Sequence, residues 1–193
     1  MLAVLGKSPV NPFSFAPSYC IMKKINALGG FMRLVCASES DAARVAALYD
    51  LCRNRPGTHW RDEYPNMLEI ERDVGQGALY MLLEGEALIG AATACEVDET
   101  EGLARWMEEE KPCEITRVCI APSRQGEGLS GVLIGLLLKA AAQKGFTAAR
   151  LLVATDVPRA KRTYLAAGFA VIETVYVPEW NDARYDCMER ALP

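Results

Sequence analysis

A β-rich segment, a polar glycine loop and an apolar helix follow one another directly in residues 113–131, CEITRVCIAPSRQGEGLSG. Small residues in such a loop let a ligand approach the backbone. The first turn of the helix adds unpaired N–H groups and the positive end of its dipole. The stretch therefore predicts an anion cradle, with a phosphate or pyrophosphate as its natural guest.

Two kinds of phosphate loop fit these residues. Gly126, Gly128 and Gly131 spell G-x-G-x-x-G, the dinucleotide fingerprint, and Asp156 ends the next predicted strand, where a ribose-binding acid would lie. That fingerprint follows its strand almost directly and opens a doubly wound sheet. Here residues 122–125 intervene, and too little chain remains for the other strands of such a sheet. The sequence therefore favours the second kind of loop.

Gln125-x-x-Gly128-x-Ser130 resembles the Q/R-x-x-G-x-G/A signature of the GCN5-related N-acetyltransferase (GNAT) family, with serine replacing the usual small residue at the last position. In that family the loop amides bind the pyrophosphate of acetyl-coenzyme A (acetyl-CoA). The resemblance implies acetyl-CoA as cosubstrate and no metal. It also implies a cofactor site formed by the strand end and the loop: Val118, Cys119, Ile120, Gln125, Gly126, Glu127, Gly128, Leu129, Ser130 and Gly131.

A second segment strengthens the resemblance. Ala160-x-x-x-Tyr164-x-x-x-Gly168-Phe169 resembles the family's A-x-x-x-Y-x-x-x-G-F block, in the right order and at the right separation from the loop. The family commonly has asparagine three residues before that alanine, and this chain has Val157 there. The contact that this asparagine gives the cofactor arm is therefore in doubt. The similarity covers residues 32–192.

Composition places the chain among soluble globular proteins. With 193 residues, 51% of them hydrophobic, it is long enough for one domain to bury its own core. A net charge of −4 argues against a nucleic-acid partner, and no apolar run is long enough to span a bilayer. Seven scattered cysteines without a C-x-x-C pair predict reduced thiols in a cytoplasmic protein. The single histidine, His59, argues against a histidine-rich metal site.

The first 31 residues differ from the rest of the chain. Prolines at positions 9, 12 and 17 interrupt regular structure, and two glycines precede a regular pattern that begins at Met32. The apolar core of MLAVLG is too short for a secretory signal. We predict an N-terminal arm at residues 1–31, either peripheral or reflecting an upstream start, and a GNAT-like domain at residues 32–193.

From Met32 onward, strand and helix patterns alternate. Residues 33–37, 79–84, 87–95, 115–120, 148–155, 169–177 and 184–192 read as strands, and 42–52, 67–74, 132–144 and 158–167 read as helices. Gly90 inside a strand suggests a bulge or a close backbone approach. The order β-α-α-β-β-β-α-β-α-β-β predicts an α/β domain with a mixed sheet. The resemblance implies that the sheet is mostly antiparallel, with helices on both faces.

Amine acetylation requires a neutral amine, a group that takes its proton and a group that protonates the leaving thiolate. Glu114, at the start of the central strand, resembles in placement the catalytic glutamate of some family members and is the candidate base. An ordered water as base, or a surface role for Glu114, stays an open alternative. Thr116 shares its strand face. Tyr164 is the candidate acid, and an ordinary core tyrosine is the alternative. Cys119 has no histidine near it in sequence to activate it.

The segment between the first two helices shapes the acceptor pocket in similar proteins. Here it contains His59, Trp60 and Tyr64 beside two carboxylates, Asp62 and Glu63. An aromatic wall with carboxylates would suit an amine cation. An equally plain interpretation is that the aromatic residues close the edge of the core.

Residues 96–110 form an acidic connection, which is either a solvated loop or an attractor for a cationic acceptor. Trp106 is expected to anchor this connection to the fold. Arg117 is expected to reach solvent or one of its carboxylates, and Arg124 is a candidate for contact with a coenzyme phosphate. The acidic residues are Asp98, Glu99, Glu101, Glu108 and Glu109.

The sequence thus favours an acetyl-CoA-dependent N-acetyltransferase acting on the amine of a small molecule or peptide. Its alternative is a non-catalytic CoA- or acyl-CoA-binding sensor module, encouraged by Val157 and Ser130. A nucleotide-binding oxidoreductase ranks third. Neither a nucleic acid nor a membrane is expected as partner, and homodimer formation is left open.

Overall fold

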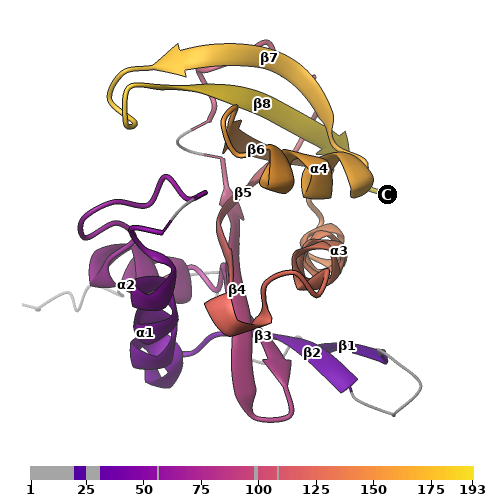
Figure 1. Cartoon of the computed structure of the whole chain (residues 1–193). Coiled ribbons are helices and arrows are strands. Elements are labelled where there is room, and N and C mark those ends of the chain that lie inside the picture. Colours follow the sequence, from indigo (N-terminus) through magenta and orange to yellow (C-terminus); the bar gives the residue numbers. More distant parts are fainter. Residues whose placement is uncertain (1–19, 25–30, 56, 98–99, 108) are drawn as a thin grey trace, which may run out of the picture.

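The computed structural model describes residues 20–24, 31–55, 57–97, 100–107 and 109–193. Within these residues one eight-stranded sheet runs in the order β1-β2-β3-β4-β5-β6-β8-β7 (Figure 1). The strands are β1 Cys20–Lys24, β2 Phe31–Cys36, β3 Leu79–Glu84, β4 Ala87–Glu96, β5 Pro112–Ile120, β6 Ala148–Ala154, β7 Ala170–Val177 and β8 Ala183–Ala191. The α-helices are α1 Ala42–Cys52, α2 Met67–Gly75, α3 Leu129–Gln143 and α4 Pro158–Ala166.

Helices cover both faces of the sheet, as the resemblance implied. Helices α1 and α2 lie on one face and α3 and α4 on the other (Figure 1). Strand β3 shows why, because its side chains alternate between two apolar layers. Leu79, Met81 and Leu83 pack in the α1 layer, whereas Tyr80 and Leu82 pack in the α3 layer. Every neighbouring pair of strands is antiparallel except β5 and β6.

Strands β5 and β6 are paired over a short length only. Three residue pairs join them, the last being Glu114 opposite Arg150. Beyond this point β5 contains a register shift against β4, and Arg117 within that shift has φ +51°. Such a bulge bends and twists its strand. The two strands therefore diverge, and the remainder of β5 leads to the glycine loop without a partner on that side.

Gly90 explains how closely β4 approaches β5. A Cβ atom at this position would lie 2.7 Å from Ile120 Cδ1 and 2.9 Å from the carbonyl oxygen of Cys119. Only glycine leaves room for the end of β5 at that separation. The register between β3 and β4 also shifts beside Gly90. The predicted close approach is confirmed, and it fixes the point from which the loop departs.

Most predicted bounds shift by a residue or two, and strand β5 begins at Pro112 rather than 115. Two further differences change the sheet and the site. Strand β1 lies inside the predicted arm and pairs with β2, with Cys20 opposite Val35. The prolines at positions 9, 12 and 17 all precede it, so they do not prevent the strand; the rest of the arm lies outside the described residues. Helix α3 begins at Leu129 rather than 132, because Gly128 takes φ +76° and turns the chain directly into the helix.

Candidate active site

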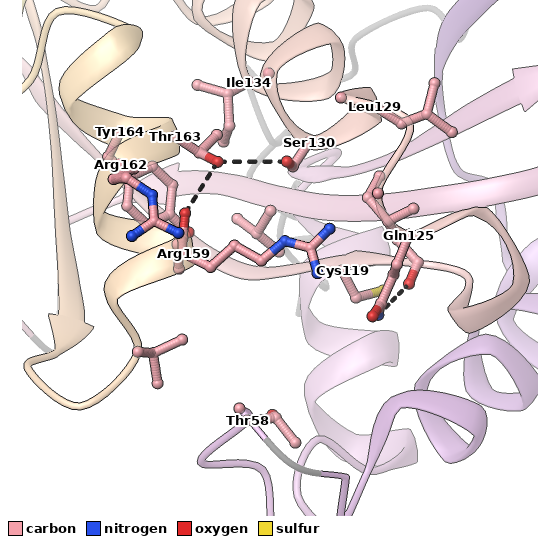
Figure 2. A pocket seen from close by; sticks show the side chains of 18 of the residues that line it. Thr58, Cys119, Gln125, Leu129, Ser130, Ile134, Arg159, Arg162, Thr163 and Tyr164 are labelled. Carbon is pink, nitrogen blue, oxygen red and sulfur yellow. Dashed lines mark hydrogen bonds between the residues drawn. The ribbon is translucent and has the colours of Figure 1, made fainter.

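A cavity of about 900 Å³ opens where the glycine loop meets α3 and α4; we call it the loop cavity. Gly126 and Gly128 both have positive φ, +96° and +76°, a conformation that glycine adopts without steric cost. Figure 2 shows the Gln125 side chain folded back, its Nε2 donating to the carbonyl oxygen of Ile120 at 3.1 Å. Ser130 Oγ lies 3.4 Å from Thr163 Oγ1 and links the start of α3 to α4.

The residues predicted to bind the cofactor gather around this cavity with one exception. Val118, Cys119 and Ile120 line it from β5. The loop and the first turn of α3 supply Gln125, Gly126, Gly128, Leu129, Ser130 and Gly131. The exception is Glu127, whose carboxylate instead accepts from Arg124 Nε at 2.9 Å. Unpaired amides at the start of α3 and the positive end of its dipole therefore face the cavity, which suits an anion.

The loop cavity is basic. One acid, Asp156, lines it beside four arginines: Arg55, Arg124, Arg159 and Arg162. Arg124 is held by two carboxylates, because it also donates to Glu84 at 2.7 Å. It is therefore already neutralised by protein groups, contrary to a simple contact with a coenzyme phosphate.

A second cavity of about 820 Å³ occupies the gap between β5 and β6; we call it the strand cavity. Glu114, Thr116 and Val118 line it from β5, and Leu152 and Ala154 from β6. The residues predicted for the acceptor pocket and for catalysis all line it: His59, Trp60, Tyr64, Glu114 and Tyr164. Its other acids are Asp62, Glu63 and Glu179, and two arginines, Arg61 and Arg117, also line it. Acidic side chains therefore outnumber basic ones here, whereas basic side chains outnumber acidic ones in the loop cavity.

The two cavities share part of their lining. Val118, Val157, Ala160 and Tyr164 belong to both, as do Gly57, Thr58 and Trp60. Val118 lies on the unpaired part of β5, and Tyr164 reaches it from α4. A molecule in the loop cavity and one in the strand cavity would therefore meet beside Tyr164. The sequence patterns did not predict this junction, because it depends on where β5 and β6 separate.

Glu114 is buried, with 4% of its surface exposed. One carboxylate oxygen, Oε2, accepts from both the backbone N–H and the hydroxyl of Thr100, each at 3.2 Å. Thr100 is itself only 1% exposed. These two donors fix the orientation of the carboxylate at the edge of the strand cavity. Thr100 lies in the acidic connection between β4 and β5, and no pattern in the sequence singled it out.

Tyr164 packs edge-on against Phe169, with 6.0 Å between the ring centroids. Desolvation raises the pKa of its hydroxyl to about 12. Among the described residues the hydroxyl has no hydrogen-bond partner, so its proton is available to a molecule in either cavity. A phenol with this pKa stays protonated at neutral pH and acts as a donor.

Arg117 does not reach solvent or the acidic connection, so that prediction is wrong. Its side chain is buried and donates from Nε and Nη2 to the two oxygens of Asp73, at 2.8 and 3.0 Å. Asp73, on α2, also accepts from Thr93 Oγ1 at 2.6 Å. Arg117 Nη1 donates to Tyr64 Oη at 3.3 Å on the wall of the strand cavity. A charged residue inside an apolar strand signals such an internal partner.

His59 ties the α1–α2 connection to the other end of the sheet. Its Nε2 lies 2.7 Å from Asp156 Oδ1, and its Nδ1 lies 3.4 Å from Tyr185 Oη. Asn181 Nδ2 donates to its carbonyl oxygen at 3.0 Å. Asp156 is thus engaged by a histidine rather than directed at a ribose, which argues against the dinucleotide interpretation.

Cys119 lines the loop cavity but is a buried thiol. Burial raises its pKa well above the ordinary value, and the group beside it is the Cys52 thiol rather than a histidine. The thiolate needed for nucleophilic attack is therefore disfavoured. Among the described residues, no group of three or more His, Cys, Asp or Glu side chains could hold a metal ion.

The acidic connection is anchored as predicted. Trp106 Nε1 donates to the carbonyl oxygen of Thr100 at 2.9 Å, and the Arg150 guanidinium lies 5.2 Å from the Trp106 ring centroid. The carboxylates of this connection that the structure describes line neither cavity. The acidity of the strand cavity comes from other segments. In the described part of the chain, no helix is both long enough and apolar enough to cross a membrane.

Residues 43–169 match the family model for the acetyltransferase (GNAT) family. This match covers more than half of the chain. It contains the glycine loop and most of the residues that line the two cavities. The chain belongs to the GNAT acetyltransferase family. The resemblance that the sequence motifs carried is confirmed, and so is the fold that it implied.

Solved structures share the fold of this GNAT acetyltransferase at low sequence identity. YncA from Salmonella typhimurium, solved with its cofactor acetyl-CoA, is 19% identical with a TM-score of 0.66, covering 84% of this chain and 94% of its own. Ribosomal-protein-alanine N-acetyltransferase from Brucella melitensis is 17% identical, with a TM-score of 0.66 and coverages of 82% and 99%. Spermidine N-acetyltransferase from Vibrio cholerae, in complex with CoA and spermine, is 20% identical, with a TM-score of 0.62 and coverages of 83% and 95%. No curated protein sequence matches significantly.

Proposed function

We propose that this GNAT acetyltransferase transfers the acetyl group of acetyl-CoA to the amine of a small, cationic molecule or of a peptide. One observation carries the proposal: a basic cavity and an acidic cavity meet beside Tyr164. The basic cavity complements the phosphates of the coenzyme, and the acidic cavity complements an ammonium group. The relatives named for spermidine and for ribosomal-protein alanine both acetylate amines, which supports this reaction type.

In the loop cavity the coenzyme would be held mainly by backbone. The amides of residues 126–130 and the N-terminus of α3 would face the pyrophosphate, as the glycine conformations allow. The Gly131 N–H instead donates to the carbonyl oxygen of Gly128 at 3.1 Å. Val157 replaces the family's usual asparagine and lines both cavities with an apolar side chain. The remaining lining near Val118 and Tyr164 is where the thioester would lie. When bound, the coenzyme supplies the activated acetyl group.

Glu114 would take the proton that the acceptor ammonium must lose. Glu114 lines the strand cavity, and the backbone N–H and the hydroxyl of Thr100 hold its Oε2 in place. Removal of the proton leaves the amine lone pair free to form the new N–C bond. The proton then passes to solvent through the strand cavity. Holding the amine next to the thioester also lowers the barrier by proximity.

Tyr164 would protonate the leaving thiolate. As the N–C bond forms, the C–S bond breaks and its electron pair stays on sulfur. The hydroxyl of Tyr164, protonated because of its pKa of about 12, donates to that sulfur and is reprotonated from solvent. The aromatic residues of the strand cavity, Trp60, Tyr64 and Trp180, would stack against the cationic acceptor.

Two measurements test this function. Acetyl-CoA and CoA should raise the melting temperature by mass action, and NADH should not. Thiol release should then be followed across a panel of a diamine, a polyamine, a basic peptide and a neutral amine. We expect turnover with cationic amines and little with the neutral one. Ligand stabilisation without thiol release from any amine would instead support the CoA-sensing alternative.

A further inference from the structure

Helix α4 carries two arginines that the catalytic scheme does not use. Arg159 and Arg162 are three residues apart, so they lie on the same side of the helix, and both line the loop cavity. Figure 2 shows both guanidinium groups on the cavity side of α4, with Arg159 extended toward the glycine loop. Its Nη2 lies 3.6 Å from the position that a Cβ atom on Gly126 would occupy.

Neither arginine has a carboxylate partner within the described part of the chain, and this distinguishes them from their neighbours. Lys161, between them, is paired with Asp186 at 2.6 Å. Arg124, across the cavity, is held by Glu84 and Glu127. Arg159 and Arg162 therefore keep uncompensated charges, both directed to one cavity.

Their position makes this arrangement unfavourable for the protein alone. Arg159 is the second residue of a helix that begins at Pro158, where the positive end of the helix dipole disfavours a cation. A second arginine one turn later adds repulsion between like charges. An anion in the loop cavity would relieve both effects. In the proposed function the amides of the glycine loop hold a pyrophosphate there, so the arginines point to further negative charge on the opposite wall.

We propose that Arg159 and Arg162 form a second phosphate subsite, in which Arg162 binds the ribose 3′-phosphate of coenzyme A and Arg159 shares its pyrophosphate. The inference rests on the proposed function, because it assumes a CoA thioester as donor. Coenzyme A carries its pyrophosphate and its 3′-phosphate on the same ribose, so the two anions lie side by side. Arg159 lies over Gly126 of the loop, and Arg162 lies one helical turn farther on.

This subsite would make the protein select complete coenzyme A. A donor that ends at pantetheine lacks both the pyrophosphate and the 3′-phosphate, and dephospho-CoA lacks only the second. The guanidinium group matches phosphate geometry through two parallel hydrogen bonds, which lysine cannot reproduce. Discrimination between CoA and dephospho-CoA is therefore a property that α4 controls and the glycine loop does not.

Calorimetric titration tests the subsite without any acceptor amine. CoA, dephospho-CoA and pantetheine are titrated into the wild type, Arg159→Gln, Arg162→Gln and Arg162→Lys. Arg33→Gln is the matched control. Arg33 lies on β2, which lines neither cavity, and its side chain pairs with Glu86. Both α4 arginines are exposed and unfavourably placed in the unliganded protein, so no variant should melt below the wild type.

The wild type should bind CoA about tenfold more tightly than dephospho-CoA, as one charge-assisted contact allows. Arg162→Gln should bring that ratio close to one while leaving dephospho-CoA affinity unchanged, and Arg162→Lys should restore part of it. Arg159→Gln should weaken CoA and dephospho-CoA by similar factors. Pantetheine affinity should not respond to any variant.

A CoA-to-dephospho-CoA ratio that persists in Arg162→Gln would overturn the subsite alone. Equal weakening of pantetheine would also overturn it, because the arginines would then act on the fold rather than on phosphate. Failure of the wild type to bind any of the three ligands would overturn both the subsite and the proposed function. If the wild type and the variants show the expected affinity ratios but the wild type transfers acetyl to no amine, the subsite stands and the catalytic proposal is removed.

Discussion

At the scale of single residues, the candidate site combines side chains that the sequence marked with others that it did not. Tyr164 could be selected because it occupies a place in a motif, and Glu114 because it lies at the start of the central strand, where some family members place a catalytic glutamate. Thr100 could not, and neither could the buried partner of Arg117. Thr100 contacts Glu114 from a connection without any periodic pattern, and the partner of Arg117 is Asp73, 44 residues away in the chain. Contacts of that separation depend on the packed fold, which periodicity does not report.

Replacing Glu114 with glutamine should lower the turnover number on the order of 10²-fold at neutral pH, because a proposed base is lost. Affinity for acetyl-CoA should stay unchanged, since Glu114 does not line the loop cavity. The limb of the pH–rate profile that rises with deprotonation of the base should disappear. Steady-state kinetics on an established acceptor measure both effects. Glu86→Gln, 91% exposed and outside both cavities, is the control. A Glu114→Gln enzyme with the full rate would assign the base to water.

Replacing Tyr164 with phenylalanine should also reduce the rate, on the order of 10²-fold for one lost proton donor. Since desolvation raises its pKa to about 12, Tyr164 stays protonated as the pH rises from 6 to 10 and loses its proton only above that range. The wild-type rate should therefore show no fall assignable to this group below pH 10. A falling limb near pH 8 that vanishes in Tyr164→Phe would contradict the raised pKa. Thermal melting of the variant must first show that the fold is retained.

At the scale of elements, β5 determines where the site forms. Its existence could be predicted from its β-rich composition, and Gly90 suggested a bulge or a close backbone approach in β4. Its pairing with β4 and β6 is seen only in the structure. The bulge at Arg117 could not be predicted, since no residue there is glycine and its side-chain partner, Asp73, lies 44 residues away in the chain. The end of pairing with β6 at Glu114 was equally hidden, because apolar residues continue along both strands beyond it.

The Asp73–Arg117 pair should be a major support of α2 against β5. Both side chains are about 1% exposed, so Asp73→Ala leaves a buried guanidinium without its counter-ion. We expect a loss of about 3–5 kcal/mol in the free energy of unfolding, measured by urea denaturation. The double variant Asp73→Leu/Arg117→Met should recover part of that loss, because it removes both charges. Asp50→Ala, at a surface ion pair, should change stability by less than about 1 kcal/mol. A comparable small loss for Asp73→Ala would show that the pair is not a support.

At the scale of the whole molecule, the order of strands and helices could be predicted along most of the chain. The exceptions lie at its beginning, where β1 extends the sheet, and in how the two parts of the sheet meet. Three residue pairs between β5 and β6 connect the part containing β1–β5 to the part containing β6, β8 and β7. Local patterns report what each segment prefers, whereas the extent of pairing between distant segments depends on the complete fold.

A chain that starts at Met32 should fold and bind acetyl-CoA. Residues 1–31 contribute β1 at the edge of the sheet. The lining of the loop cavity begins at Cys52 and that of the strand cavity at Gly57. Removing β1 exposes the outer edge of β2, so we expect a lower melting temperature but unchanged ligand affinity. Circular dichroism and calorimetric titration measure the two quantities. Loss of soluble protein would show that the domain begins before Met32.

The two cavities draw their distinctive residues from different parts of the chain. The glycine loop and α4 build the loop cavity, whereas residues 57–64 and 179–181 supply much of the strand cavity. Mutations accumulating in these two surface connections can change which amine is accepted without altering the backbone amides that face the donor. The solved acetyltransferases named for ribosomal-protein alanine and for spermidine are 17% and 20% identical to this chain. One architecture can then serve different acceptors at such low identity.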